Sequence, residues 1–220
     1  PGIDAAQVEG NDVVANARLL LERSTDAKLP AEHKISTKDA FYNIVSLLAG
    51  MRVEDAEVAA RRVYEQGSAL YPPWRTHLFA DRDGCSMRRI IETLKRRGMR
   101  VYLLSAGLDV LSWAAADALD VPRAQALGSL LAVKDGVYTG EVRDSTYTSK
   151  GPVIRQWLAA PPILVFGDSP QSDFDMMLEA AAAAFMVNPR PAFQERDDQE
   201  AGGRFVAVTF DGTERDVASP

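Results

Sequence analysis

The sequence predicts an α/β protein with a three-layer, mostly parallel sheet and a separate helical segment. From about residue 86 onward, short apolar runs alternate with apolar stripes of helical spacing. This alternation is typical of a parallel sheet that is covered by helices on both faces. Residues from about 13 to 75 carry helical stripes and no clear strand. They predict a separate helical segment next to the α/β core.

Two amphipathic stripes define the helical segment. The first has apolar residues at i, i+3, i+4 and i+7, namely Phe41, Ile44, Val45 and Leu48. Gly50 can end this helix, since glycine is favoured after a helix C-terminus. The second stripe includes Val58 and Leu70, and the pair Pro72-Pro73 stops it.

The remaining elements follow in chain order. The patterns predict helices near 87–94, 111–119, 153–158 and 174–181, and strands over 101–104, 163–166, 185–187 and 205–210. The segment 132–140 has Asp135-Gly136 at its centre, which favours a hairpin with a two-residue turn. The strand near 205–210 is interpreted as an edge strand, and residues 214–220 as a flexible tail.

Polar residues follow two of the predicted strands. Asp168 comes directly after the apolar run 163–166, and Asp173 follows within the same loop. Because ligands of parallel sheets bind at the carboxyl ends of the strands, these carboxylates could hold a divalent cation beside a phosphate. Ser105 follows the run 101–104, where small residues let backbone N–H groups approach an anion. Lys150 lies at a helix start, because Pro152 suits the first helical turn.

In this order the residues resemble the motifs of the haloacid dehalogenase superfamily, within it the phosphoserine-phosphatase-like branch. Ser105 is similar to the second motif, Lys150 to the third, and Gly167-Asp168 with Asp173 to the fourth, with four residues between the carboxylates. The hairpin near 132–140 and the segment 187–189 also resemble this branch. The resemblance covers about residues 86–191 and implies a Rossmann-like core.

The resemblance implies a role for each matching residue. Asp168 would be a catalytic ligand of Mg²⁺, and Asp173 would either join the metal site or orient Lys150. Lys150 would offset the charge of a bound phosphate. Ser105, with the N–H groups of Ala106 and Gly107, would hold the phosphate oxygens. The implied substrate is a small phosphorylated metabolite.

The first motif of the family, a strand ending in Asp-x-Asp, is incomplete. Its first Asp is the nucleophile and its second is a general acid/base. Near the N-terminus Gly2 would fill the nucleophile position, and only Asp4 would remain, as the acid/base residue. The sequence Asp81-Arg82-Asp83 has the right letters, but lies where a tight loop is expected. Near the other end of the chain, Thr209 would take the nucleophile position before Asp211.

Composition narrows the function further. The 220 residues carry a formal net charge of −6, which argues against nonspecific nucleic-acid binding. Cys85 is the only cysteine, so a reducing, cytoplasmic location is expected. No apolar stretch is long enough to span a bilayer, and no signal-peptide pattern is visible. The resemblance implies a small helical cap over 13–75 that closes over the site, and a core over 1–12 and 76–213. A helical layer packed permanently on the sheet is the alternative for 13–75.

Two functions of different classes remain open. The first is a magnesium-dependent phosphatase, which requires a nucleophile at another position or a chain shortened at its start. The second is a relative that has lost catalysis and acts as a phosphate-binding, metal-binding or interaction protein. The intact motifs two to four favour the first. Dehalogenase activity is a third possibility, against which the acidic pair Asp168 and Asp173 argues, since it favours a metal-dependent site.

Overall fold

The computed structural model describes most of the chain after residue 27. The described residues are 28–70, 86–144, 150–189 and 191–209, with Ala17, Leu20, Arg23, Ser24 and Thr146. They fall into two compact units, one of residues 1–58 and 129–144 and the other of residues 59–128 and 145–220. This grouping differs from the division into cap and core expected above, whose boundaries stay a prediction.

The first unit contains helix α2 (Thr37–Ser46), the start of α3 (Val53–Leu70) and strand β3 (Val137–Asp144). Helix α2 begins after Ser36, whose hydroxyl accepts the N–H of Asp39 at 3.0 Å, a typical N-cap. The segment after α2 packs on β3. Gly140 of β3 is required there, since a Cβ atom at this position would lie 2.9 Å from the Cβ of Ala49.

Strands β2 (Ala126–Lys134) and β3 form the predicted hairpin. They pair antiparallel, with Lys134 opposite Val137. The two residues of the turn both have positive φ, 51° at Asp135 and 77° at Gly136. Such a pair of angles defines a type I′ turn, which matches the twist of the flanking strands. The hairpin expected from the Asp-Gly pair is therefore confirmed.

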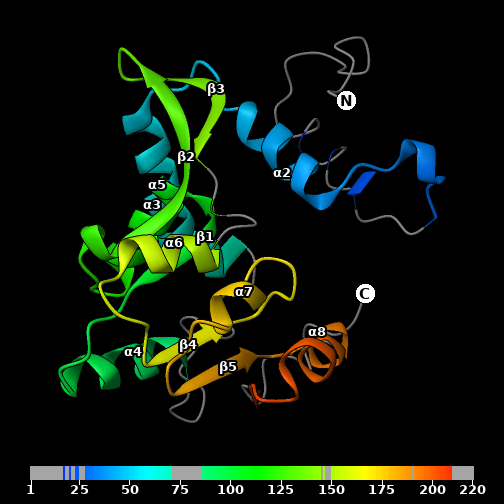
Figure 1. Ribbon diagram of the computed structural model, residues 1–220. Coiled ribbons are helices and arrows are strands. Elements are labelled where there is room, and N and C mark those ends of the chain that lie inside the picture. The colour runs from blue at the N-terminus through cyan, green and yellow to red at the C-terminus, as the bar shows by residue number, and fades with distance from the viewer. Residues whose placement is uncertain are drawn as a thin grey trace. The chain divides into compact units, whose positions relative to one another are not determined.

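The second unit contains the alternating helices and strands (Figure 1). Its helices are α4 (Met87–Arg96), α5 (Asp109–Ala118), α6 (Lys150–Trp157), α7 (Phe174–Met177) and α8 (Pro191–Arg196). Its strands are β1 (Leu103–Leu108), the start of β2, β4 (Leu164–Gly167), β5 (Ala183–Val187) and β6 (Val206–Val208). A short helical turn lies at 123–125, and a π-helical turn at Asp197–Ala201 follows α8; another short helical turn, at 31–33, belongs to the first unit. No helix within the described ranges is long and apolar enough to cross a membrane.

Strands β4, β5 and β6 form a parallel sheet in this order. Phe166 of β4 pairs with Phe185 of β5, and their rings stack with centroids 4.7 Å apart. Strand β6 pairs with β5 and ends the sheet. The parallel sheet, the strand at 185–187 and the edge strand after residue 205 are thus confirmed, and with them the α/β class.

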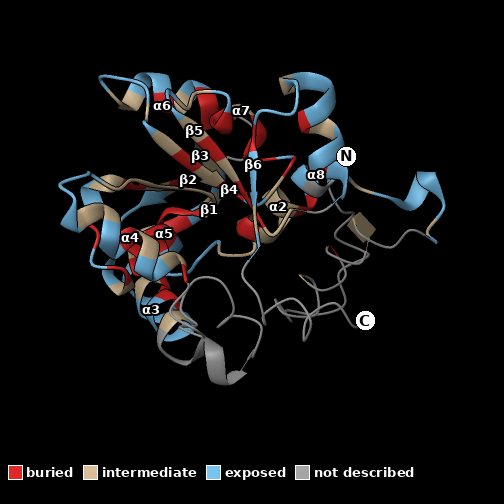
Figure 2. Cartoon of the chain, turned by 90° about the horizontal axis from the view of Figure 1, so that it is seen from below, coloured by how far each residue is buried: buried red, intermediate tan, exposed pale blue. Residues whose placement is uncertain are grey.

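One apolar core joins these strands to their helices. Its buried side chains come from α6, β4, α7, β5, α8 and the residue before β6, and include Ile154, Val165, Phe174, Met177, Met186, Phe193 and Phe205. Leu104 of β1 also packs against it. Figure 2 shows α7 largely buried. Because burying one such side chain contributes roughly 1.5–3 kcal/mol, this core fixes where α6 and α7 lie on the sheet.

Among the elements near the site, β1 and α7 differ most from the predicted bounds. Strand β1 begins at Leu103 and runs through Ser105 to Leu108, so Ser105 lies within the strand. Gly128 of β2 permits this, because a Cβ atom there would lie 2.6 Å from the carbonyl carbon of Leu108. Helix α7 is only one turn long, because the chain after it turns back to the segment before β4, where Ala181 donates its N–H to Pro162 at 2.8 Å.

Candidate active site

The turn after β4 closes on the carboxylate of Asp173. Its Oδ2 accepts the N–H of Asp168 at 2.9 Å and that of Ser169 at 3.0 Å. Gly167, the last residue of β4, allows this approach, because a Cβ atom there would lie 2.7 Å from the Cβ of Asp173. The sequence Gly-Asp followed by a second Asp therefore folds as a compact loop in which Asp173 holds the backbone of Asp168.

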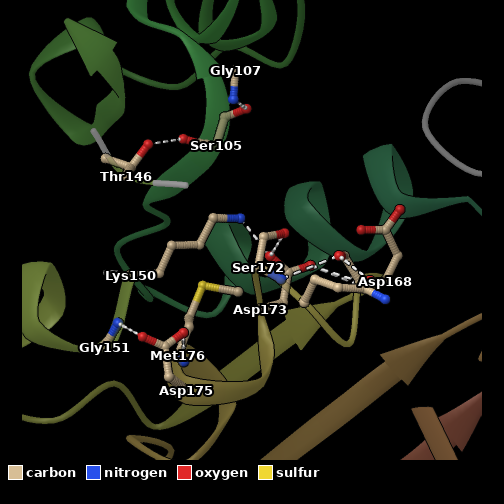
Figure 3. A network of polar contacts seen from close by, with 12 residues as sticks. Ser105, Gly107, Thr146, Lys150, Gly151, Asp168, Ser172, Asp173, Asp175 and Met176 are labelled. Atoms are coloured by element: carbon tan, nitrogen blue, oxygen red, sulfur yellow. Dashed lines mark hydrogen bonds and ion pairs between the residues drawn. The ribbon is translucent and has the colours of Figure 1, made fainter. Parts of the chain in front are cut away.

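The other oxygen of Asp173 binds Lys150 (Figure 3). The Lys150 ammonium, on the first residue of α6, forms an ion pair with Oδ1, and the two side chains are only 6% and 5% exposed. The Ser172 hydroxyl donates to the same oxygen at 3.2 Å. Asp173 thus accepts four hydrogen bonds, which matches the number of lone-pair sites on a carboxylate.

These contacts decide the charge of Asp173. Burial alone would raise its pKa, but the nearby charge of Lys150 and the hydrogen bond from its ammonium oppose this effect. The hydrogen bonds from the N–H groups of Asp168 and Ser169 also lower the pKa, and together these effects bring the pKa of Asp173 below its usual value. Asp173 is therefore an ionised, fully engaged carboxylate. This arrangement fits the orienting role for Lys150, while its role as a metal ligand stays a prediction.

Asp168 presents an exposed carboxylate at the end of β4, and carboxylate oxygens are the ligands that Mg²⁺ prefers. Within the described ranges no three His, Cys, Asp or Glu side chains are grouped closely enough to hold a metal ion. Asp168 as a ligand of Mg²⁺ therefore stays a prediction. Asp4, Asp81, Asp83 and Asp211, which were considered for the first motif, lie outside the described residues, as does Gly2.

Ser105 belongs to a second polar group. Its hydroxyl accepts the N–H of Gly107 at 3.0 Å, which leaves the hydroxyl hydrogen able to donate to an anion. Its carbonyl accepts a hydrogen bond from the buried hydroxyl of Thr146. Figure 3 draws this group and the Lys150–Asp173 group as two separate sets of contacts. Both lie in the second unit, and the binding of phosphate by Ser105, Ala106 and Gly107 stays a prediction.

Sequence reasoning missed several residues that hold the site. Besides Thr146 and Ser172, Asp175 accepts the N–H of Gly151 at 3.0 Å. Arg196 of α8 donates to the carbonyl of Pro170, and its guanidinium carbon lies 4.0 Å from the centroid of the Phe174 ring. Glu200 accepts from the same guanidinium at 3.0 Å. The contacts of Thr146, Asp175 and Arg196 with Ser105, Gly151 and Pro170 join residues 41, 24 and 26 positions apart, so that no local pattern indicated them.

The parallel sheet, the acidic turn after β4 and the buried lysine define a protein of the α/β class with polar side chains at the carboxyl end of a parallel strand. The model of the haloacid dehalogenase-like hydrolase family matches residues 8–178. The chain belongs to this family. No curated protein matches it.

Solved structures show the same fold. A phospho-aspartyl intermediate analogue of phosphoserine phosphatase is 19% identical with a TM-score of 0.55, over 90% of this chain and 84% of that one. A probable phosphoserine phosphatase from Vibrio cholerae is 17% identical with a TM-score of 0.57, over 94% of this chain and 57% of that one. Cytosolic 5'-nucleotidase IIIB bound to cytidine is 13% identical with a TM-score of 0.59, over 97% of this chain and 72% of that one. The fold is thus that of the phosphoserine-phosphatase-like branch.

Proposed function

We propose that this protein is a magnesium-dependent phosphatase that acts on a small phosphorylated metabolite. The observation that carries the proposal is the buried ion pair between Lys150 and Asp173. A buried pair is costly to build and favours specificity of structure over stability. Here it ties a cation to the loop that presents Asp168, as a site for a phosphate and a metal ion requires.

The chemistry assigns a task to each residue. Phosphoryl transfer depends mainly on positioning and on neutralisation of charge. Lys150 would approach a phosphate oxygen and offset its charge, and Ser105 would donate its hydroxyl hydrogen to another oxygen. Asp168 would hold Mg²⁺, which supplies further charge neutralisation when bound. Asp4 would move the proton to the leaving group.

Whether the chain has a nucleophile distinguishes a phosphatase from a phosphate-binding protein. With Gly2 at the position of the first motif, an aspartyl-phosphate cannot form there. We therefore expect the unaltered chain to hydrolyse p-nitrophenyl phosphate poorly, even with Mg²⁺, and Gly2→Asp to raise the rate. A competent unaltered chain would instead place the nucleophile elsewhere, and replacing Asp81, Asp83 and Asp211 in turn would locate it. If neither form is active but phosphate raises the melting temperature, the alternative function as a phosphate-binding protein is favoured.

The metal assignment has its own test. We expect Asp168→Asn to weaken Mg²⁺ binding at least about tenfold, because it removes a charged oxygen ligand. Asp83→Asn should have a much smaller effect. The matched control is Asp55→Asn, which removes an exposed carboxylate from the first turn of α3. Calorimetric titration of the three variants with MgCl₂ measures the effects. Equal losses at positions 168 and 83 would mean that the wrong acidic residue was assigned.

A further inference from the structure

The start of α6 is held by two acidic residues of one turn. Lys150, its first residue, binds the carboxylate of Asp173. The next residue, Gly151, donates its N–H to Oδ2 of Asp175 at 3.0 Å. The second oxygen of Asp175 accepts the N–H of Met176 at 2.9 Å, so the carboxylate is held on both sides (Figure 3).

The contact between Gly151 and Asp175 is also close in steric terms. A Cβ atom at position 151 would lie 2.9 Å from the carbonyl oxygen of Asp175 and 3.3 Å from its Oδ2. A Cβ atom does not approach a backbone oxygen this closely, and glycine, which has no Cβ, allows the approach. Helices α6 and α7 are thus in backbone contact at the residue that follows Lys150.

Electrostatics explain why this position needs an anion. The N-terminus of a helix carries unpaired N–H groups and a partial positive charge. A lysine at the first position adds a full positive charge to the same end, and α6 has no acidic residue in its first turn. Asp173 pairs with the ammonium, and Asp175 adds a second carboxylate, which binds the backbone of the helix start. Asp175 therefore stabilises the backbone at the helix start, next to the residue that carries the cation.

We propose that Asp175 is a positioning residue, which fixes Lys150 through the N–H of Gly151. Asp173 holds the ammonium head and Asp175 holds the backbone, so that together they restrict where the ammonium lies. The importance of this position for phosphate rests on the proposed function. The positioning itself is a property of the chain and is tested without a substrate.

The test measures how fast Lys150 is acetylated. The full chain is treated with a low concentration of acetic anhydride, and modification is followed by mass spectrometry, with exposed Lys134 as the internal reference. The buried, ion-paired Lys150 is expected to react slowly. Asp175→Ala should raise its relative rate roughly tenfold, because loss of a hydrogen bond to a charged group makes local opening more frequent. Asp175→Asn should partly restore the low rate, since its amide oxygen can still accept from Gly151.

A control separates positioning from general loss of stability. Ser86→Ala removes the N-cap of α4, where the Ser86 hydroxyl accepts the N–H of Arg89 at 3.3 Å in the same unit. It should lower the melting temperature and leave the rate at Lys150 unchanged. If Asp175→Ala does not fold, Gly151→Ala, which disturbs the same contact and keeps the carboxylate, replaces it.

Two outcomes would overturn the proposal: an unchanged rate at Lys150 in a folded Asp175→Ala variant, or an equal increase in Ser86→Ala. The proposed function fails separately. If acetylation changes as expected but no variant with a restored nucleophile hydrolyses a phosphate ester or binds phosphate, the positioning role stands and the phosphatase proposal falls.

Discussion

Replacing Asp173 by Asn tests the central ion pair. The amide has one accepting oxygen, whereas Asp173 accepts from Lys150 and Ser172 on one side and from two backbone N–H groups on the other. Whichever way Asn turns, its NH₂ group faces donors. Removal of one partner of a buried pair costs about 3–5 kcal/mol, a large part of the roughly 5–15 kcal/mol that stabilises a typical protein.

The assay is urea denaturation at about pH 7, with the free energy of unfolding obtained by linear extrapolation. Because the pair is buried, the double variant Lys150→Met with Asp173→Asn should lose less stability than the sum of the two single variants. The control is Asp117→Asn, which breaks a pair with Arg123 in which both side chains are 41% exposed. Exposed pairs contribute about 1 kcal/mol or less. A loss at Asp173 as small as that of the control would refute the reasoning.

The pH dependence gives a second measurement. The pKa of Asp173 is lower in the folded protein than its usual value, which is about 3.9 in unfolded chains. The stabilisation by ionised Asp173 is therefore present in full above that value and is lost as the pH falls through the lower, folded pKa. The difference in stability between the wild type and Asp173→Asn should stay constant from about pH 8 to pH 5 and narrow below about pH 4. A difference that already narrows at neutral pH would contradict the assigned charge.

Two further predictions concern close contacts in the second unit. Gly128→Ala should lower the free energy of unfolding by more than about 2 kcal/mol, because its Cβ atom would lie 2.6 Å from the backbone nitrogen of Asp109. Thermal denaturation measures this loss. A loss below about 1 kcal/mol would show that the position is less crowded than the structure indicates. Arg196→Met should speed amide hydrogen exchange in the loop that contains Pro170, because the guanidinium no longer holds its carbonyl. Arg123→Met, which removes an exposed guanidinium, should leave the exchange rate of this loop unchanged. Equal exchange rates in both variants would refute the second prediction.

The fold could be predicted from sequence where local patterns were sufficient. The apolar run before Asp168 indicated β4, and the pair Asp135-Gly136 indicated the turn of the hairpin, because each signal is contained in a few consecutive residues. The bounds of β1 and α7 were wrong. A neighbouring strand with Gly128 decides how far β1 extends, and a hydrogen bond to Pro162 decides where α7 stops.

In the site, too, features set by neighbouring residues could be predicted, and features set by distant contacts could not. The position of Lys150 at a helix start was confirmed, since proline and the apolar stripe after it form a local signal. Asp175 and Arg196 were missed, because their partners lie 24 and 26 residues away. A carboxylate that accepts from a distant backbone N–H resembles, in sequence, any solvated acidic residue.

The composition of the core has a consequence for how the chain could be shortened. The family model matches residues up to 178, but Met186, Phe193 and Phe205 of the core lie beyond this point. A protein cut at the end of the matched region would keep Ser105, Lys150, Asp168 and Asp173 and lose strands β5 and β6, which complete the sheet of β4. It would leave Phe174 and Met177 exposed to water, and such a truncated chain is expected to aggregate. The boundary of the conserved family pattern and the boundary of the folding unit therefore differ in this protein.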